Sequence, residues 1–315
     1  MAYTTGGTIQ ALDYNLLAWG GNTQVYNATP DNLAEIWGVG NGQNGYGQDT
    51  SLISTLAAGT TVSATQWAGL VYTLNKTLGH QAGTAALLTG AVQGGNIGIV
   101  AGATITAFAN VAAAITTINT NKHNFNSTRG STTASANFDA TFSTSTFTQT
   151  ITVTFASADQ ARYYFNSGGR LNLVFSPSGL TDNAKETSYT DLMNAIGTLS
   201  LDVLTSTRSG TGETLTTNGL AIGYWDLTTS NQTIIKLTSD NANYTANTLE
   251  VLMKVAGAAG SNGGLGTQVI YDITYTDGAD EAFDDAVSGT FRHRIDVIRP
   301  EVTYLADVWG TITVS

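Results

Sequence analysis

The sequence predicts an α+β fold: an N-terminal helical, glycine-rich region followed by an antiparallel β-sandwich domain with a short inserted helix. Two patterns support this prediction. In the first part of the chain, apolar residues recur at helical spacing between glycine-rich segments. In the second part they alternate with Thr, Asn and Gln, as in strands with one buried face. We therefore expect a helical, glycine-rich assembly domain (1–125), a linker (126–137) and a sandwich domain (138–315).

The composition indicates which kinds of partner the protein can bind. Charged residues make up 11% of the 315 residues, whereas ordinary soluble proteins contain about 25%, so Thr, Ser, Asn and Gly must form much of the polar surface. The net charge of -11 comes without a basic patch, and nucleic-acid binding needs such a patch to displace counterions. We therefore expect extensive protein–protein contact and no nucleic-acid partner.

The chain contains no cysteine, which excludes disulfides, thiolate catalysis and thiolate metal ligation. Residues 1–5 lack the basic and apolar regions of a signal peptide, so we expect synthesis in a cytoplasm. The longest apolar-looking region, 97–114, is interrupted by Gly, Thr and Asn, which predicts no membrane insertion.

The N-terminal domain carries an irregular internal repeat. The segments "TGGTIQA" (5–11), "AGTTVSA" (58–64) and "AGATITA" (101–107) each precede a helix-like run. They indicate a reused strand-turn-helix unit, with Ser63 or Thr106 as an N-cap. Apolar stripes on the second and third helices predict packing within this domain or, alternatively, a short seam between copies of a homo-oligomer. The stripes are Trp67, Leu70, Leu74 and Leu78, and Phe108, Val111, Ile115 and Ile118.

Two glycine-rich segments, 37–48 and 87–100, lie between the helices. The first has the glycine density of a phosphate-binding loop, but no Lys follows it and the strand-to-helix spacing is missing. We expect an ordered loop with tight turns, pinned by Trp37 and Tyr46. Residues 122–137 are polar and small, which places the linker in this part of the chain.

The sandwich prediction is based on short alternating runs between turn residues. In the first run, Phe147, Ile151, Val153 and Phe155 alternate with polar side chains. Such runs, bounded by Gly, Asn, Asp or Ser, predict an antiparallel sandwich or barrel-like domain. The predicted strands are 147–155, 171–175, 199–206, 220–227, 233–239, 248–257, 267–276, 288–298 and 308–315.

The stretch "FASADQARYYFNSGGRLNLVF" (155–175) joins the first two of these strands, and it predicts a helix rather than a hairpin. Ser157 and Gln160 have the spacing of a capping box. Ala161, Tyr164 and Phe165 lie on one face of this helix. Arg162 itself is expected to pair with Asp159 or Asp182.

The helix should end at a glycine pair, where Gly168 or Gly169 supplies a left-handed residue. We expect Tyr163 and its two aromatic neighbours to pack over one end of the sandwich. A sugar or receptor platform built from Tyr163 and Tyr164 is the alternative.

Three stretches resemble a known family. "ARYYFNSGGRL" after "TFTQTITVTFAS", the opening "GGTIQALDYN" and the segment "IWGVGNGQNGYGQ" are similar to segments of structural proteins from tailed bacteriophage particles. The resemblance covers parts of the first half of the chain and nothing after about residue 178. It implies a virion protein of the viral tail or tail fibre, made in the bacterial host, assembling with itself and with other virion proteins, and without an assigned chemistry.

Candidate chemical sites are sparse in this sequence. His80, His123 and His293 do not have the spacing of metal ligands, and no Gly-x-Ser-x-Gly nucleophile elbow is present. The acidic run 271–285 is either a solvated loop or a Ca²⁺ site. The candidate ligands in that run are Asp277, Asp280 and Asp284. We expect no enzyme, since no pair of carboxylates suggests a glycosidase or depolymerase groove, and no cofactor apart from the possible cation.

The sequence therefore predicts a structural component of a tailed phage particle, tail-associated and homo-oligomeric. One alternative is a receptor- or glycan-binding fibre module, with exposed aromatic side chains at Tyr224, Trp225 and Tyr244. Another alternative is a head or neck appendage protein.

Overall fold

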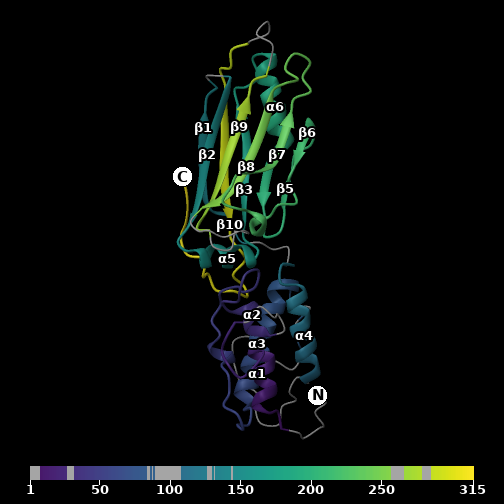
Figure 1. Ribbon diagram of the computed structural model, residues 1–315, viewed down its shortest axis with the longest axis vertical. Coiled ribbons are helices and arrows are strands. Elements are labelled where there is room, and N and C mark those ends of the chain that lie inside the picture. Colours follow the sequence, from purple (N-terminus) through teal and green to yellow (C-terminus); the bar gives the residue numbers. More distant parts are fainter. Residues whose placement is uncertain are drawn as a thin grey trace. The chain divides into compact units, whose positions relative to one another are not determined.

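The computed structural model describes residues 8–26, 32–83, 86, 88, 108–125, 130, 132–142, 145–256, 266–278 and 285–315 (Figure 1). Its contacts divide the chain into two compact units. Unit 1 consists of Met1–Arg129 together with Glu301–Val308, and unit 2 consists of Gly130–Pro300 together with Trp309–Ser315. The C-terminal segment therefore contributes to both units, which the sequence did not predict.

Unit 1 is helical among its described residues. Its elements are α1 (Ala11–Trp19), α2 (Leu33–Trp37), a 3-10 turn (Ser51–Ile53), α3 (Ala64–Ala82) and α4 (Phe108–Thr120). In the first two copies of the repeat a helix begins at the final alanine, as predicted, but the described part of each copy forms only an isolated β-bridge, between Gln10 and Thr61, in place of the expected strand. The third copy, 101–107, lies outside the described residues.

The long helix α3 begins as the sequence predicts. The side chain of Ser63 accepts a hydrogen bond from Gln66 N, and the Gln66 side chain accepts one from Ser63 N, which completes a capping box. The α3 stripe is buried, as are Val111, Ile115 and Ile118 on α4. These helices therefore pack within unit 1, as the first of the two alternatives predicted.

The glycine-rich loop after α2 is pinned as expected. Trp37 Nε1 donates to Asp49 O at 2.7 Å, and Tyr46, with 1% of its surface exposed, donates through its hydroxyl to Lys122 O at 2.8 Å. Of the second glycine-rich segment, 87–100, almost all lies outside the described residues.

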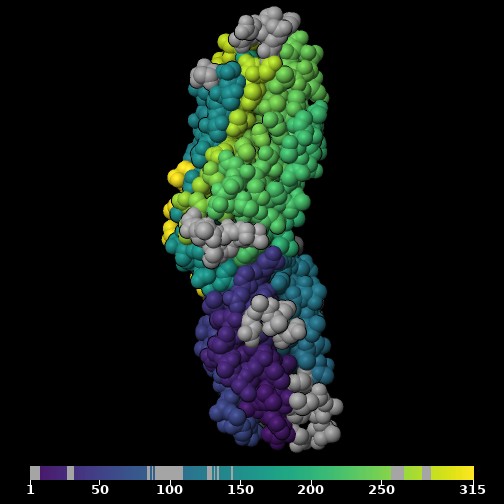
Figure 2. Space-filling view, viewed as in Figure 1, coloured from purple at the N-terminus to yellow at the C-terminus, as the bar shows by residue number. Residues whose placement is uncertain are grey.

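Unit 2 contains two antiparallel sheets, and the α+β sandwich prediction is confirmed. One sheet has the order β1 (Thr132–Ala140), β10 (Thr290–Ile298), β3 (Arg170–Ser178), β4 (Thr198–Leu201), β5 (Ser206–Arg208). The other has the order β11 (Ile312–Val314), β2 (Thr146–Phe155), β9 (Gln268–Thr276), β8 (Thr248–Ala256), β7 (Gln232–Thr238), β6 (Thr214–Asn218). Figure 2 shows the outer face of β7 and β8, in green, as a continuous surface.

The core of unit 2 is formed by the strict alternation of the central strands. In β8, β9 and β10, and in β3 as far as Phe175, every second side chain is buried and the others are partly exposed. Aromatic rings from the two sheets meet inside: Tyr275 of β9 lies 4.6 Å from Phe291 of β10, measured between ring centroids. Full burial of one such large apolar side chain stabilises a fold by roughly 1.5–3 kcal/mol.

Two helices lie at opposite ends of this sandwich (Figure 1). The short helix α5 (Ala158–Asn166) connects β2 to β3, as predicted. The helix α6 (Ala184–Ile196) connects β3 to β4 and packs against β3 and β8. Helix α6 was not predicted, although Tyr189, Leu192 and Ile196 have helical spacing and are buried.

Three details of the predicted organisation are wrong. The second half of the expected linker, 132–137, forms the first part of β1 and pairs with β10. The predicted strand 220–227 is a turn that ends in the 3-10 helix Tyr224–Asp226. The predicted strand 199–206 is divided into β4 and β5, which pair with each other. The polar strand β6 had no counterpart in the prediction.

Candidate functional site

The α5 end of the sandwich is built around the predicted capped helix. Ser157 Oγ accepts a hydrogen bond from Gln160 N at 3.1 Å, which satisfies one of the amides at the helix start. Arg162 pairs with Asp159 at 3.1 Å, the first of its two expected partners, and its guanidinium lies over the Tyr163 ring at 4.7 Å. These contacts fix the start of the helix and hold the Arg162 side chain against it.

The aromatic side chains of α5 are buried. Tyr164 and Phe165 are fully enclosed, and 9% of Tyr163 is exposed. The hydroxyl of Tyr164 donates toward the carbonyls of Arg170 and Ile298, at 2.6 and 2.8 Å, so that the ring ties the helix to two strands. Burial raises the pKa of Tyr164 well above its ordinary value. The predicted closure of one end is confirmed, and the alternative of a tyrosine platform is not.

Both glycines of the predicted stop are required, for different reasons. Gly168 has a φ of +91°, the left-handed conformation that ends the helix. Gly169 leaves room for the neighbouring ring, because a Cβ atom there would lie 2.6 Å from Tyr164.

The proposed binding aromatics Tyr224 and Trp225 are also buried in this end. Tyr224 has no exposed surface and stacks on Phe165 at 3.9 Å between ring centroids. Trp225 is 6% exposed, and its Nε1 donates to Asn166 Oδ1 at 2.9 Å. The expectation that these two side chains are exposed is wrong, because each fills a space beside α5.

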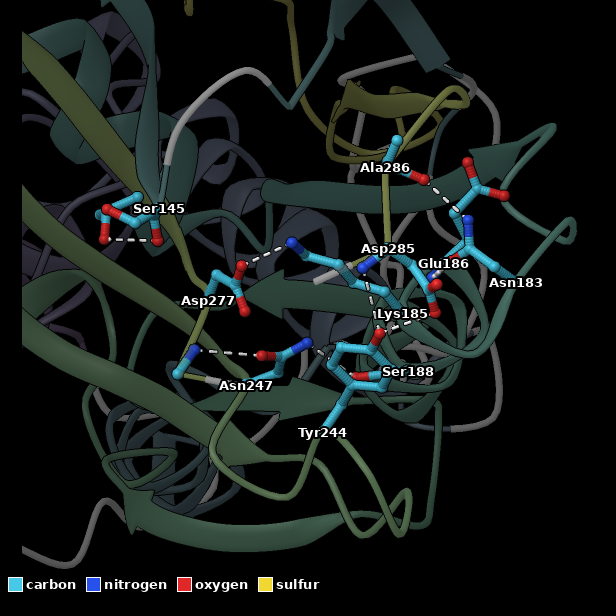
Figure 3. Close-up of polar contacts among 12 residues, drawn as sticks. Ser145, Asn183, Lys185, Glu186, Ser188, Tyr244, Asn247, Asp277, Asp285 and Ala286 are labelled. Carbon is cyan, nitrogen blue, oxygen red and sulfur yellow. Dashed lines mark hydrogen bonds and ion pairs between the residues drawn. The ribbon is translucent and has the colours of Figure 1, made fainter. Parts of the chain in front are cut away.

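The opposite end of the sandwich carries a polar network that joins α6 to the loops around it (Figure 3). Its centre is Glu186, which lies in the first turn of α6 and has a buried side chain. One carboxylate oxygen accepts from Ser288 N at 2.5 Å, Ser288 Oγ at 2.8 Å and Gly289 N at 3.1 Å, while the other accepts from Asp182 N at 2.8 Å. Desolvation opposes ionisation, but these hydrogen bonds outweigh it and lower the pKa of Glu186.

A buried ion pair lies beside this carboxylate. Lys185 Nζ is 2.5 Å from Asp277 Oδ2, and 3% of Lys185 is exposed. Figure 3 shows Lys185 pointing from α6 toward Asp277 at the end of β9. Asn247 bridges the same region by accepting from Gly278 N at 3.1 Å and donating to Ser188 Oγ at 3.3 Å. The Lys185–Asp277 ion pair and its neighbours hold together the loops that meet at this end of the sandwich.

The Ca²⁺ hypothesis lacks support from the residues that can be placed. Of its three candidate ligands, Asp277 pairs with Lys185, while Asp280 and Asp284 lie outside the described residues. Within the described part of the chain, no group of three His, Asp or Glu side chains is arranged to hold a metal ion. The carboxylate of Asp277 therefore has a cationic side chain where the hypothesis placed a cation.

The third proposed binding aromatic, Tyr244, belongs to the same network. It is 1% exposed, and its hydroxyl donates to Asp285 Oδ2 at 2.7 Å. Burial and this hydrogen bond raise the pKa of Tyr244. The expectation of an exposed Tyr244 is wrong, because its ring is used to anchor the loop between β7 and β8 to the loop after β9.

The three histidines lie in separate environments. His80 lies 4.0 Å from Glu301 in unit 1, and His123 donates through Nε2 to Gln43 O at 2.9 Å. His293 is fully buried in the sandwich, where Nε2 accepts from the Tyr275 hydroxyl at 2.7 Å and Nδ1 contacts Gln149 Oε1. Burial lowers the pKa of His293 to about 3, so that the ring is neutral at ordinary pH.

A groove with a volume of about 440 Å³ lies in the described part of unit 1. Residues 8–12, Asn22 and 58–61 line it, and none of these side chains ionises. Such a lining offers no general acid, general base or metal ligand.

In the polar clusters at the two ends of the sandwich, carboxylates, amines and rings hold loops and strand ends in place. The capped helix was found from its local spacing. The α6 network was missed, although Asn183 and Glu186 have the spacing of an N-cap with an acidic residue in the first turn. Its partners Asp277 and Ser288 come from distant loops, which sequence spacing does not connect.

No family model matches the chain, and comparisons with curated proteins and with solved structures found no significant similarity. Among the described helices, none has the combined length and apolar character needed to cross a membrane.

Proposed function

We propose that the chain is a structural component of a tailed bacteriophage particle, tail-associated and assembling as a homo-oligomer with other virion proteins. The resemblance of three sequence stretches to such proteins is the origin of the proposal. In the structure these stretches contribute α1, the pinned glycine-rich loop and α5, and all three serve packing. That use of the motifs fits a protein whose role is assembly.

The observation that carries the self-assembly part of the proposal is the edge strand β6. It pairs with β7 on one side and with no other described strand, and all five of its side chains are exposed. Monomeric proteins usually protect such an edge with charged side chains. The sequence of β6, TLTTN, contains no charged side chain, and it exposes Leu215, although the β6–β7 register shifts between Leu215 and Thr217. An uncharged open edge supports strand addition between copies.

The first test concerns association. Native mass spectrometry and light scattering should give a homo-oligomer for the wild-type chain, and Leu215→Lys should weaken it because the charge blocks strand addition. Leu204→Lys is the matched control, since Leu204 is similarly exposed and lies outside the named strands. A wild-type chain that remains monomeric at high concentration would refute self-assembly.

The second test concerns the particle. Purified particles of the phage whose genome encodes the chain should contain its tryptic peptides in stoichiometric amounts beside other tail proteins. Complete absence of these peptides from intact particles would refute the virion role, whatever the oligomeric state.

A further inference from the structure

The glycine-rich loop of unit 1 brings an amine, an amide and a buried carboxylate into contact. Lys122 Nζ donates to Asn44 Oδ1 at 2.6 Å, and Asn44 Nδ2 donates to Glu35 Oε1 at 3.1 Å. Glu35 has no exposed surface and Asn44 is 7% exposed. Because an ammonium can only donate and a carboxylate oxygen accepts, the two contacts fix the orientation of the Asn44 amide.

These side chains are held from three directions. Glu35 lies in α2, whose first turn is capped by the Asn32 side chain, and its Oε1 also accepts from Asn41 N at 3.2 Å. Asn44 precedes Gly45, which lies so close to the Val39 carbonyl that a Cβ atom there would be 2.1 Å away. The loop therefore has little freedom to withdraw the amide.

Lys122 approaches from the turn that follows α4. Its backbone carbonyl accepts a hydrogen bond from the Tyr46 hydroxyl at 2.8 Å, so the backbone that carries the amine is fixed to the same loop. Burial lowers the pKa of Lys122, which the negative charge of Glu35 partly opposes. The lowered pKa increases the fraction of neutral amine, which is the nucleophilic form.

The contact places the amine close to the carboxamide carbon that it would attack to form an amide bond. Because Cγ is bonded to the oxygen that accepts the hydrogen bond, the amine lies within about 4 Å of that carbon, and near-attack distances are about 3–3.5 Å. The lysines at 185, 236 and 254 face carboxylates instead, namely those of Asp277, Glu250 and Asp272. Lys122 differs from them because it faces an amide beside a buried carboxylate.

We propose that Lys122 and Asn44 form an intramolecular isopeptide bond, with Glu35 as the proton-transfer group. The neutral Nζ attacks Cγ of Asn44 and a C–N bond forms. The bond from Cγ to Nδ2 then breaks, one proton of the amine passes through Glu35 to Nδ2, and this nitrogen leaves as ammonia. Glu35 ends the reaction in its initial protonation state, and the step requires no oxidant, reductant or cofactor.

The product is a covalent link between the glycine-rich loop and the end of α4, across 78 positions of the sequence. A cysteine-free chain has no disulfide with which to close such a loop. The isopeptide bond would supply that closure, and it would resist reducing conditions.

Mass spectrometry of the purified full-length chain tests the proposal. The intact mass should be lower than the sequence mass by one ammonia. A tryptic digest should contain one branched peptide that joins the segments around Asn44 and Lys122, and cleavage after Lys122 should be lost. An intact mass equal to the sequence mass, with normal cleavage after Lys122, would overturn the proposal.

Variants separate the isopeptide bond from other losses of ammonia. Glu35→Gln and Lys122→Arg should each restore the full mass, and Lys76→Arg, the matched control on α3, should retain the deficit. Lys122→Arg keeps a cationic donor at a partly exposed position, so it carries the test if Glu35→Gln does not fold. A succinimide at the Asn44–Gly45 bond would also lose ammonia. A deficit that persists in Lys122→Arg would therefore refute the isopeptide bond.

Discussion

Acidification should destabilise the sandwich through a buried histidine. His293 lies on the inner face of β10, against Tyr275 of β9, Gln149 of β2 and Phe175 of β3, and the carboxylate of Asp139 acts on it from β1. Its two ring nitrogens are occupied by one donor and one acceptor, which is the pattern of a neutral imidazole. Protonation would place a second N–H opposite the tyrosine hydroxyl and a charge in the core.

The magnitude follows from the difference between the folded and unfolded pKa values. Burial lowers the pKa of His293 to about 3, although Asp139 acts in the other direction, whereas an unfolded histidine has a pKa of about 6.5. Between these values the unfolded state binds more protons, so the free energy of unfolding falls as the pH decreases. The stability is fully present above the unfolded pKa. At about pH 5 the loss from this group is roughly 2 kcal/mol.

The assay compares the wild-type chain with His293→Gln, whose side chain can still donate and accept but does not ionise. Urea unfolding at about pH 7.5 and about pH 5 should be followed by hydrogen exchange of peptides from β9 and β10, which reports on unit 2. The wild type should lose about 2 kcal/mol more than the variant between the two conditions. His123→Gln, in unit 1, is the control and should leave the unit 2 difference unchanged. Equal losses in wild type and His293→Gln would refute the reasoning.

Three further predictions concern the stability of unit 2. Gly169→Ala should lower the free energy of unfolding by about 1–3 kcal/mol, because the new Cβ atom would lie 2.6 Å from the Tyr164 ring. Thermal melts measure this change. In the same melts Gly21→Ala should change the free energy of unfolding little, because no atom lies within 4 Å of the Cβ atom that it adds. Lys185→Met should cost about 3–5 kcal/mol in calorimetry, because the mostly buried Asp277 carboxylate loses the ammonium group with which it pairs. Excess chelator should leave the melting temperature unchanged, and a decrease would instead support a Ca²⁺ site.

The parts of the fold that could be predicted are those with local signals. Helix α5 was found because its cap and its glycine stop lie within a dozen residues, and the central strands because their side chains alternate without a break. The segment 220–227 shows the limit of this approach. Its apolar residues also alternate, but Trp225 turns toward Asn166, 59 positions away, and the backbone forms a turn instead of a strand.

The polar edge strand was missed for the opposite reason. The sequence of β6 has a single large apolar side chain and no buried face, so alternation gives no signal there. Its backbone is recruited by pairing with β7, which is itself held by β8. Edge strands of this kind depend on the sheet beside them, and the sheet is a product of tertiary packing.

The proposed binding residues show the same limit of local sequence signals. Tyr224, Trp225 and Tyr244 were proposed as exposed because they stand among turn residues, and turns are usually at the surface. Each is nevertheless buried, because a large ring beside a turn can fold back and fill the end of the sandwich. Residue type and local context placed these aromatic residues beside turns, but they did not predict whether each ring points into the sandwich or toward solvent.

The Glu35, Asn44 and Lys122 cluster had no local signal, because its members are brought together across 78 positions by the fold of unit 1. That separation is also what would make a bond between them effective. In the chain-entropy model, closing a loop of this length removes roughly 4–5 kcal/mol of denatured-state entropy at room temperature, and whole domains are stable by only about 5–15 kcal/mol. A single Lys–Asn link would then account for a large share of the stability of unit 1. Because Glu35→Gln removes the proton transfer but preserves the shape of the side chain, its effect on unfolding should exceed that of a lost hydrogen bond, which is about 1–3 kcal/mol.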